Sequence, residues 1–243
     1  LAEVHWRLPF AVYLLPLISL VLSAYLKKDA ASVTIKQAAI IPPIQSTPVI
    51  SGKYGIHIRH LVQLMLFYGL VTYVVLAVTF NLPFLMEAHH FSSGNSGLMI
   101  SLFFLAIMAP GFMLDSLVKL LGNKTKLYSL LAIAIGLLLI WISPTEWLIV
   151  PGCILVGLGY GIIQPLIYDK TVDTAIPQKT TLALAFVMVM NYLAILLSPF
   201  ITDFFQWIFH TGSQEFPFIF NLCITILIMY WAYAKKEEFL FSD

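Results

Sequence analysis

The sequence predicts an all-α integral membrane protein with seven transmembrane helices. Sixty per cent of the 243 residues are hydrophobic and only 10% are charged, against roughly 25% charged residues in a soluble domain. Seven apolar stretches approach or exceed the roughly 20 residues that a helix needs to cross a bilayer. Of the 13 Lys and Arg residues, all except Arg7 fall in four segments on one side of these stretches.

The seven spans follow one another along the whole chain, separated by mostly short polar segments. Trp6 and Arg7 precede the first span as an interfacial anchor. The fourth span is short, but Lys124 and Lys126 flank one end and Trp141 lies at the other, which suits anchoring at both surfaces. The predicted spans are residues 8–26, 60–84, 96–118, 127–143, 147–168, 181–203 and 216–234.

The distribution of charge predicts the orientation of these spans. The basic segments are 27–59, 119–126, 170–179 and 235–236, and Lys and Arg accumulate in cytoplasmic loops. We therefore expect a multi-pass protein of the cell (inner or plasma) membrane, with the N-terminal end of this chain outside and the C-terminus in the cytoplasm. The middle of each span is free of Asp, Glu, Lys and Arg, because charge at that depth is costly. A net charge of +1 gives a nucleic-acid partner no electrostatic support.

One connection is much longer than the others and divides the chain. Residues 27–59 contain Pro42, Pro43 and Pro48, a density that predicts a flexible or extended cytoplasmic linker. It separates residues 1–26 from the six spans in 60–234, and residues 235–243 form a cytoplasmic tail. The six spans divide into 60–143 and 147–234, with opposite orientations. This predicts a six-helix bundle with a 3+3 inverted repeat, a layout found in many secondary transporters.

Polar side chains lie inside several of these spans and are candidate substrate contacts. Tyr160 and Gln164 are four residues apart and share one helix face with Tyr168. Tyr68 and Thr72 nearly share a face of the span 60–84, and Asn191 lies near the middle of 181–203. These groups either line a central cavity or form interhelical hydrogen bonds. A cavity of aromatic, amide and hydroxyl groups suits a lipophilic or neutral solute more than a small anion.

Two further patterns concern helix packing and shape. Gly157 and Gly161 form a small-xxx-small pair, which predicts a close approach of the span 147–168 to a neighbouring helix. Pro110 and Pro165 are interpreted as kink sites.

The linker followed by six spans resembles the C-terminal half of a major facilitator superfamily transporter. His5-Trp6-Arg7-Leu8-Pro9-Phe10 is similar to the outer turn before the sixth helix of that family. The resemblance implies that residues 1–26 are the last helix of a missing N-terminal bundle. Ala109-Pro110-Gly111-Phe112-Met113-Leu114-Asp115, followed by Gly122 and basic residues, resembles the family's motif between helices eight and nine, although the spacing is stretched. By this resemblance Gly111, Asp115 and Gly122 are cytoplasmic-gate residues, and the alternative is an ordinary helix end and turn.

The resemblance implies a secondary active transporter that works by alternating access and is most similar to the drug-efflux antiporters. The expected partners are a small-molecule substrate, protons, the lipid bilayer and the missing N-terminal half, with the coupling carboxylate in that half. A sugar or metabolite uptake permease of the same superfamily is the alternative. A seven-helix receptor is the alternative of another class, but Asp-Arg-Tyr and Asn-Pro-x-x-Tyr are absent from the sequence. We expect no enzyme, cofactor or metal, and interpret Glu87, His89 and His90 as part of an outer loop.

Overall fold

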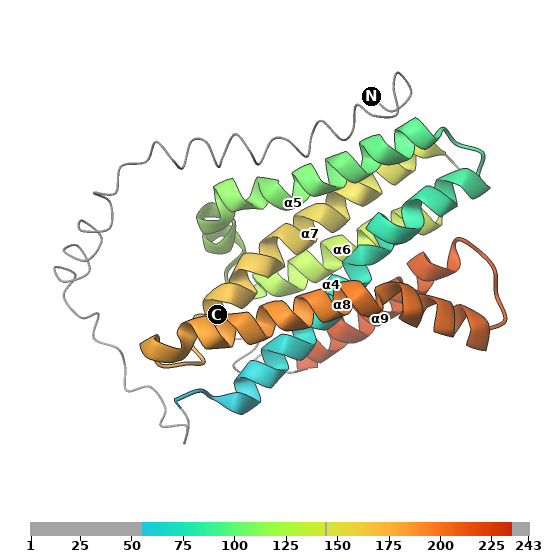
Figure 1. The fold of residues 1–243 in the computed structure, drawn as a ribbon. Coiled ribbons are helices and arrows are strands. Elements are labelled where there is room, and N and C mark those ends of the chain that lie inside the picture. The colour runs from blue at the N-terminus through green and yellow to red at the C-terminus, as the bar shows by residue number, and fades with distance from the viewer. Residues whose placement is uncertain (1–54, 144, 235–243) are drawn as a thin grey trace, which may run out of the picture. The chain divides into compact units, whose positions relative to one another are not determined.

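Six α-helices form the bundle in a computed structural model that describes residues 55–143 and 145–234 (Figure 1). The predicted span 8–26, the linker up to residue 54 and the tail 235–243 lie outside the described residues. Figure 1 shows successive helices running in alternate directions, joined by short connections at two ends of the bundle. The helices are α4 (Ile58–Ala88), α5 (Ser93–Leu121), α6 (Thr125–Trp141), α7 (Glu146–Val172), α8 (Thr180–Ile208) and α9 (Phe216–Ala234), with the short 3-10 helices η2 (Gly122–Lys124) and η3 (Pro177–Lys179) between them.

Each predicted span from residue 60 onward corresponds to one of these helices. Five of the helices are long and apolar enough to cross a membrane, and α6, with 17 residues, is a shorter apolar helix. Most helices continue past the apolar stretch that predicted them, so that Glu87 and Asp169 lie inside α4 and α7. The helical backbone satisfies its own hydrogen bonds, which is what a chain in lipid requires.

Small hydroxyl side chains inside the helices bond to their own helix. Ser129 donates to the Thr125 carbonyl at 2.8 Å, Thr171 to Ile167 at 2.7 Å and Thr225 to Asn221 at 2.7 Å. Bonding to the preceding turn lets a hydroxyl enter an apolar environment without a partner on another helix. A hydroxyl that bonds to a different helix is therefore distinguished from these, because its bond depends on how the helices pack.

Helices α4 and α7 lie at the centre of the bundle. α7 packs along α5 and α6, α4 packs along α8 and α9, α4 and α7 touch each other, and α6 also packs against α9. The core is apolar, with Phe67, Leu82, Leu137 and Ile163 almost completely buried.

Glycines allow α7 to approach both of its neighbours. A Cβ atom at Gly157 would lie 2.5 Å from the Phe103 carbonyl oxygen of α5, and one at Gly161 would lie against the Ile107 backbone. The close approach predicted for this glycine pair is confirmed, and α5 is the neighbour. On another face of α7, a Cβ atom at Gly159 would lie 2.5 Å from the Ser129 carbonyl oxygen of α6.

The two ends of the bundle differ in charge. All six Lys and Arg residues in the described part of the chain lie where α4 begins, α5 turns into α6 and α7 turns into α8. We call this the basic end. Here residues 55–57 lie against the α7–α8 turn: Ile56 and Ala175 form an isolated antiparallel bridge, and the His57 amide donates to the Thr174 carbonyl at 2.7 Å.

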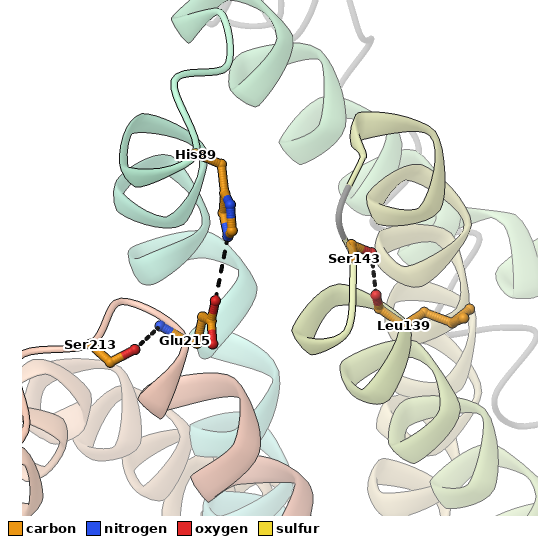
Figure 2. A network of polar contacts seen from close by, with 5 residues as sticks. All are labelled: His89, Leu139, Ser143, Ser213 and Glu215. Atoms are coloured by element: carbon orange, nitrogen blue, oxygen red, sulfur yellow. Dashed lines mark hydrogen bonds and ion pairs between the residues drawn. The ribbon is translucent and has the colours of Figure 1, made fainter.

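The opposite end carries Glu87, Glu146 and Glu215, and the described residues place no Lys or Arg there. Figure 2 shows His89, just after α4, facing Glu215, just before α9, with 3.6 Å between Nε2 and Oε1. The amide of Glu215 also donates to Ser213 Oγ at 3.2 Å, and Ser143 donates to the Leu139 carbonyl at the end of α6. Both side chains of the His89–Glu215 pair are partly exposed, so the pair contributes at most about 1 kcal/mol.

Candidate functional site

Six polar side chains from α4, α7 and α8 form one continuous hydrogen-bonded group inside the bundle. We call it the polar cluster. Its members are Tyr68 and Thr72 of α4, Tyr160, Gln164 and Tyr168 of α7, and Asn191 of α8.

The first part of the polar cluster joins all three helices. Thr72 Oγ1 of α4 donates to Asn191 Oδ1 of α8 at 2.9 Å. The Tyr160 hydroxyl of α7 lies 3.1 Å from Thr72 Oγ1 and 3.4 Å from Asn191 Oδ1. Thr72 thus bonds to other helices, unlike the hydroxyls that bond to their own helix. Tyr160 is the junction, because its hydroxyl also lies 3.4 Å from that of Tyr68.

The second part of the polar cluster extends along α7 toward the basic end. The hydroxyls of Tyr68 and Tyr168 are 2.9 Å apart, and Gln164 Nε2 donates to the Tyr168 hydroxyl at 3.3 Å. The rings of Tyr68 and Tyr160 stack with centroids 6.4 Å apart, and the ring of Tyr168 meets Tyr68 edge-on at 5.7 Å. Aromatic packing of this kind restricts the rings and fixes the direction of their hydroxyls.

The polar cluster runs from the core to an open cavity. Tyr68, Thr72 and Tyr160 are buried, whereas Gln164, Tyr168 and Asn191 are half-buried. Tyr168 also lines a cavity of about 560 Å³ between α5, α7 and α8. The other lining residues are Leu114, Val118, Pro165, Leu166, Asp169, Val172 and Leu184. A solute in this cavity would therefore meet one edge of the polar cluster.

The polar cluster offers hydrogen bonds without fixed charge. Its members are phenol, hydroxyl and amide groups, which are uncharged at neutral pH and both donate and accept hydrogen bonds. Such groups together with aromatic faces can bind a neutral or lipophilic molecule and fix its orientation.

All five residues predicted as substrate contacts belong to the polar cluster, where they bond to one another or to Tyr168. Tyr68, Thr72, Tyr160, Gln164 and Asn191 come from three helices that are far apart in the sequence. Tyr168, which the spacing of four residues had placed on the same helix face as Gln164, completes the group.

The three predicted gate residues all lie toward the basic end of α5. Gly111 and Asp115 are one helical turn apart in α5, and Gly122 ends this helix. A Cβ atom at Gly111 would meet open space. The side chain of Asp115 lies outside the described part of the chain.

Gly122→Ala is expected to lower the free energy of unfolding by about 1–3 kcal/mol, because φ +52° and ψ −143° lie in a region that is costly for residues with a Cβ atom. Thermal unfolding of the purified protein measures the effect. Gly111→Ala on the same helix is the matched control and should be neutral or slightly stabilising, since Ala favours helix. Equal loss of stability in both variants would contradict the backbone argument.

The fold is that of a multi-pass helical membrane protein, and a hydrogen-bonded group of uncharged polar side chains lies inside its bundle. The model of the Major Facilitator Superfamily matches residues 1–199, which is more than half of the chain. The chain therefore belongs to this superfamily of secondary transporters, as the resemblance predicted, and the match does not favour the receptor alternative. A comparison with curated proteins found no match.

Proposed function

We propose that this chain, together with an N-terminal bundle of the same protein, moves a small neutral or lipophilic solute across the membrane by alternating access, as a proton-coupled efflux transporter. The observation that carries the substrate class is the polar cluster. Its uncharged hydroxyl and amide groups, bonded between three helices, offer hydrogen bonds and aromatic surface but no fixed charge to a ligand.

The pattern of helix contacts supports the proposed 3+3 inverted repeat. If α4, α5 and α6 are exchanged with α7, α8 and α9, the pair α4–α8 becomes α7–α5, and the pair α4–α9 becomes α7–α6. All four of these helix pairs are packed against each other. α4 and α7, the first helices of the two triplets, occupy equivalent central positions, and the polar cluster forms where they meet.

We further propose that an N-terminal bundle of the same protein covers α5 and α8. These helices expose many large apolar side chains, including Phe112 at 86% and Tyr192 at 67%. Exposed apolar side chains of a membrane helix face either lipid or other helices. The open cavity that reaches the polar cluster lies between α5, α7 and α8, which favours a second bundle on this side. The proposed coupling carboxylate then lies in that bundle. The six Lys and Arg residues at the basic end support the proposal that this end of the bundle faces the cytoplasm.

Combined Gln164→Ala and Asn191→Ala substitutions test the proposed binding site. We expect the KM for efflux of the neutral lipophilic dye Nile red to rise about tenfold or more, because each substitution removes hydrogen-bonding groups of a half-buried site. Dye fluorescence in everted vesicles, normalised to folded protein, measures the rate. Collapse of the proton gradient should abolish accumulation if efflux is proton-coupled.

Two amides outside the polar cluster provide matched controls. Asn221 of α9 donates to its own Pro217 carbonyl at 2.7 Å, and Gln206 of α8 donates to the Ser213 carbonyl at the opposite end. Asn221→Ala with Gln206→Ala should leave the KM unchanged. An unchanged KM in the Gln164 and Asn191 variant would remove both residues from the site.

Uptake of a sugar or related metabolite is the second candidate function. Four hydroxyls and two amides within one group also match the hydrogen-bonding needs of a polyhydroxylated solute. Uptake of labelled hexoses into right-side-out vesicles distinguishes the two functions. Hexose uptake without Nile red efflux would replace the efflux proposal.

A further inference from the structure

An apolar groove lies between α6 and α9, away from the polar cluster. It has a volume of about 400 Å³, within the range of ligand pockets. Leu127, Tyr128 and Leu131 line it from α6, and Ile226, Met229, Tyr230 and Tyr233 line it from α9. Tyr128 is in the first turn of α6 and Tyr233 in the last turn of α9, so the groove starts at the basic end.

The groove is apolar, and its tyrosines lie toward the basic end. Leu131 and Ile226 lie deeper along α6 and α9, whereas Tyr128, Tyr230 and Tyr233 lie nearer to this end. These tyrosines are 45%, 72% and 66% exposed. Tyrosine is enriched at the level of lipid head groups, where its ring meets acyl chains and its hydroxyl meets water.

A basic residue lies next to the start of α6. Lys124 is exposed and immediately precedes α6 as its N-cap, four residues before Tyr128 of the groove. It belongs to the basic end, where the six described Lys and Arg residues gather. The lysine suits the head group of an anionic lipid, and the apolar groove between two transmembrane helices suits its acyl chain.

We propose that this groove binds one anionic phospholipid, with an acyl chain between α6 and α9 and its phosphate at Lys124. The proposal requires only that the bundle lies in a bilayer, and it stands independently of the transported substrate. Electrostatic attraction selects an anionic head group, and the groove retains the chain.

The test uses the full chain, reconstituted in vesicles of equal amounts of phosphatidylglycerol and phosphatidylcholine and then released for native mass spectrometry. We expect one retained phospholipid with about a fivefold preference for phosphatidylglycerol, the size of effect that one lysine near a lipid surface produces. Lys124→Gln should abolish the preference. Leu131→Trp, which fills the groove, should remove the retained lipid.

Matched controls separate the groove from general effects. Leu138 is an exposed residue of the same helix outside the groove, and Lys119 is a basic residue near the end of α5. Leu138→Trp and Lys119→Gln should leave both the lipid count and the preference unchanged. Equal retention of the two lipids by the unmodified chain would overturn the proposal. So would a change in oligomeric state, rather than in lipid count, on Leu131→Trp, because the groove would then be an interface between copies.

Discussion

Replacing Gly161 with Leu is expected to lower the free energy of unfolding by about 3 kcal/mol or more and to reduce the yield of folded protein. The reason is a backbone contact. A Cβ atom at Gly161 would lie against the Ile107 carbonyl group of α5, 2.9 Å from its carbonyl carbon. A neighbouring side chain could rotate away, but a helix backbone cannot, so α5 and α7 would have to separate along their length.

The Gly161 effect should be specific to its position. Gly97 is also a helical glycine, in α5, but a Cβ atom there would meet nothing within 4 Å. Gly97→Leu adds the same side chain and should change stability by less than about 1 kcal/mol, because it improves helix propensity without a clash. Thermal unfolding of both purified variants measures the difference. Similar unfolding temperatures would show that α5 and α7 are not in the close contact described.

The glycines of α7 also show what the sequence can predict about packing. The spacing of Gly157 and Gly161 was sufficient to predict a close helix contact. It did not identify α5 as the partner, since a small-residue face fits any helix that reaches it. Gly159, between them in the sequence, contacts α6 instead. Which helix Gly159 contacts depends on how α7 is oriented about its axis between α5 and α6, and the packing of the whole bundle sets that orientation.

The helices from α4 to α9 were predictable because apolar stretches are the strongest signal in this sequence. The residues at which the helices end were less predictable. The fifth span was predicted to end at residue 168, but α7 continues through Asp169 to Val172. Hydropathy locates the part of a helix that lies in lipid, and a helix can extend into water with polar residues. The prediction therefore located the apolar part of each helix and underestimated its length.

The polar cluster was largely predictable for the same reason. A polar side chain inside an apolar span needs a partner, and Thr72, Tyr160 and Asn191 find one another. The sequence could not show which groups would bond, because Thr72 and Asn191 are 119 residues apart. It also could not separate a substrate site from a set of interhelical bonds.

Tyr160→Phe separates these two interpretations most directly. The substitution removes only the hydroxyl that lies within 3.4 Å of Thr72, Asn191 and Tyr68. We expect a stability loss of about 0.6 kcal/mol, typical of an interhelical hydrogen bond in a membrane. We also expect the KM for Nile red efflux to rise about tenfold, because the groups that the hydroxyl orients would no longer be fixed for binding.

Tyr73→Phe is the matched control, since it makes the same chemical change on α4. The Tyr73 hydroxyl lies 3.4 Å from Thr202 Oγ1 of α8 and bridges two helices outside the polar cluster. Its loss should lower stability by a similar amount and leave the KM unchanged. If both variants lose only stability, the polar cluster is a set of structural hydrogen bonds. If only Tyr160→Phe raises the KM, the hydroxyls and amides between α4, α7 and α8 participate in substrate binding.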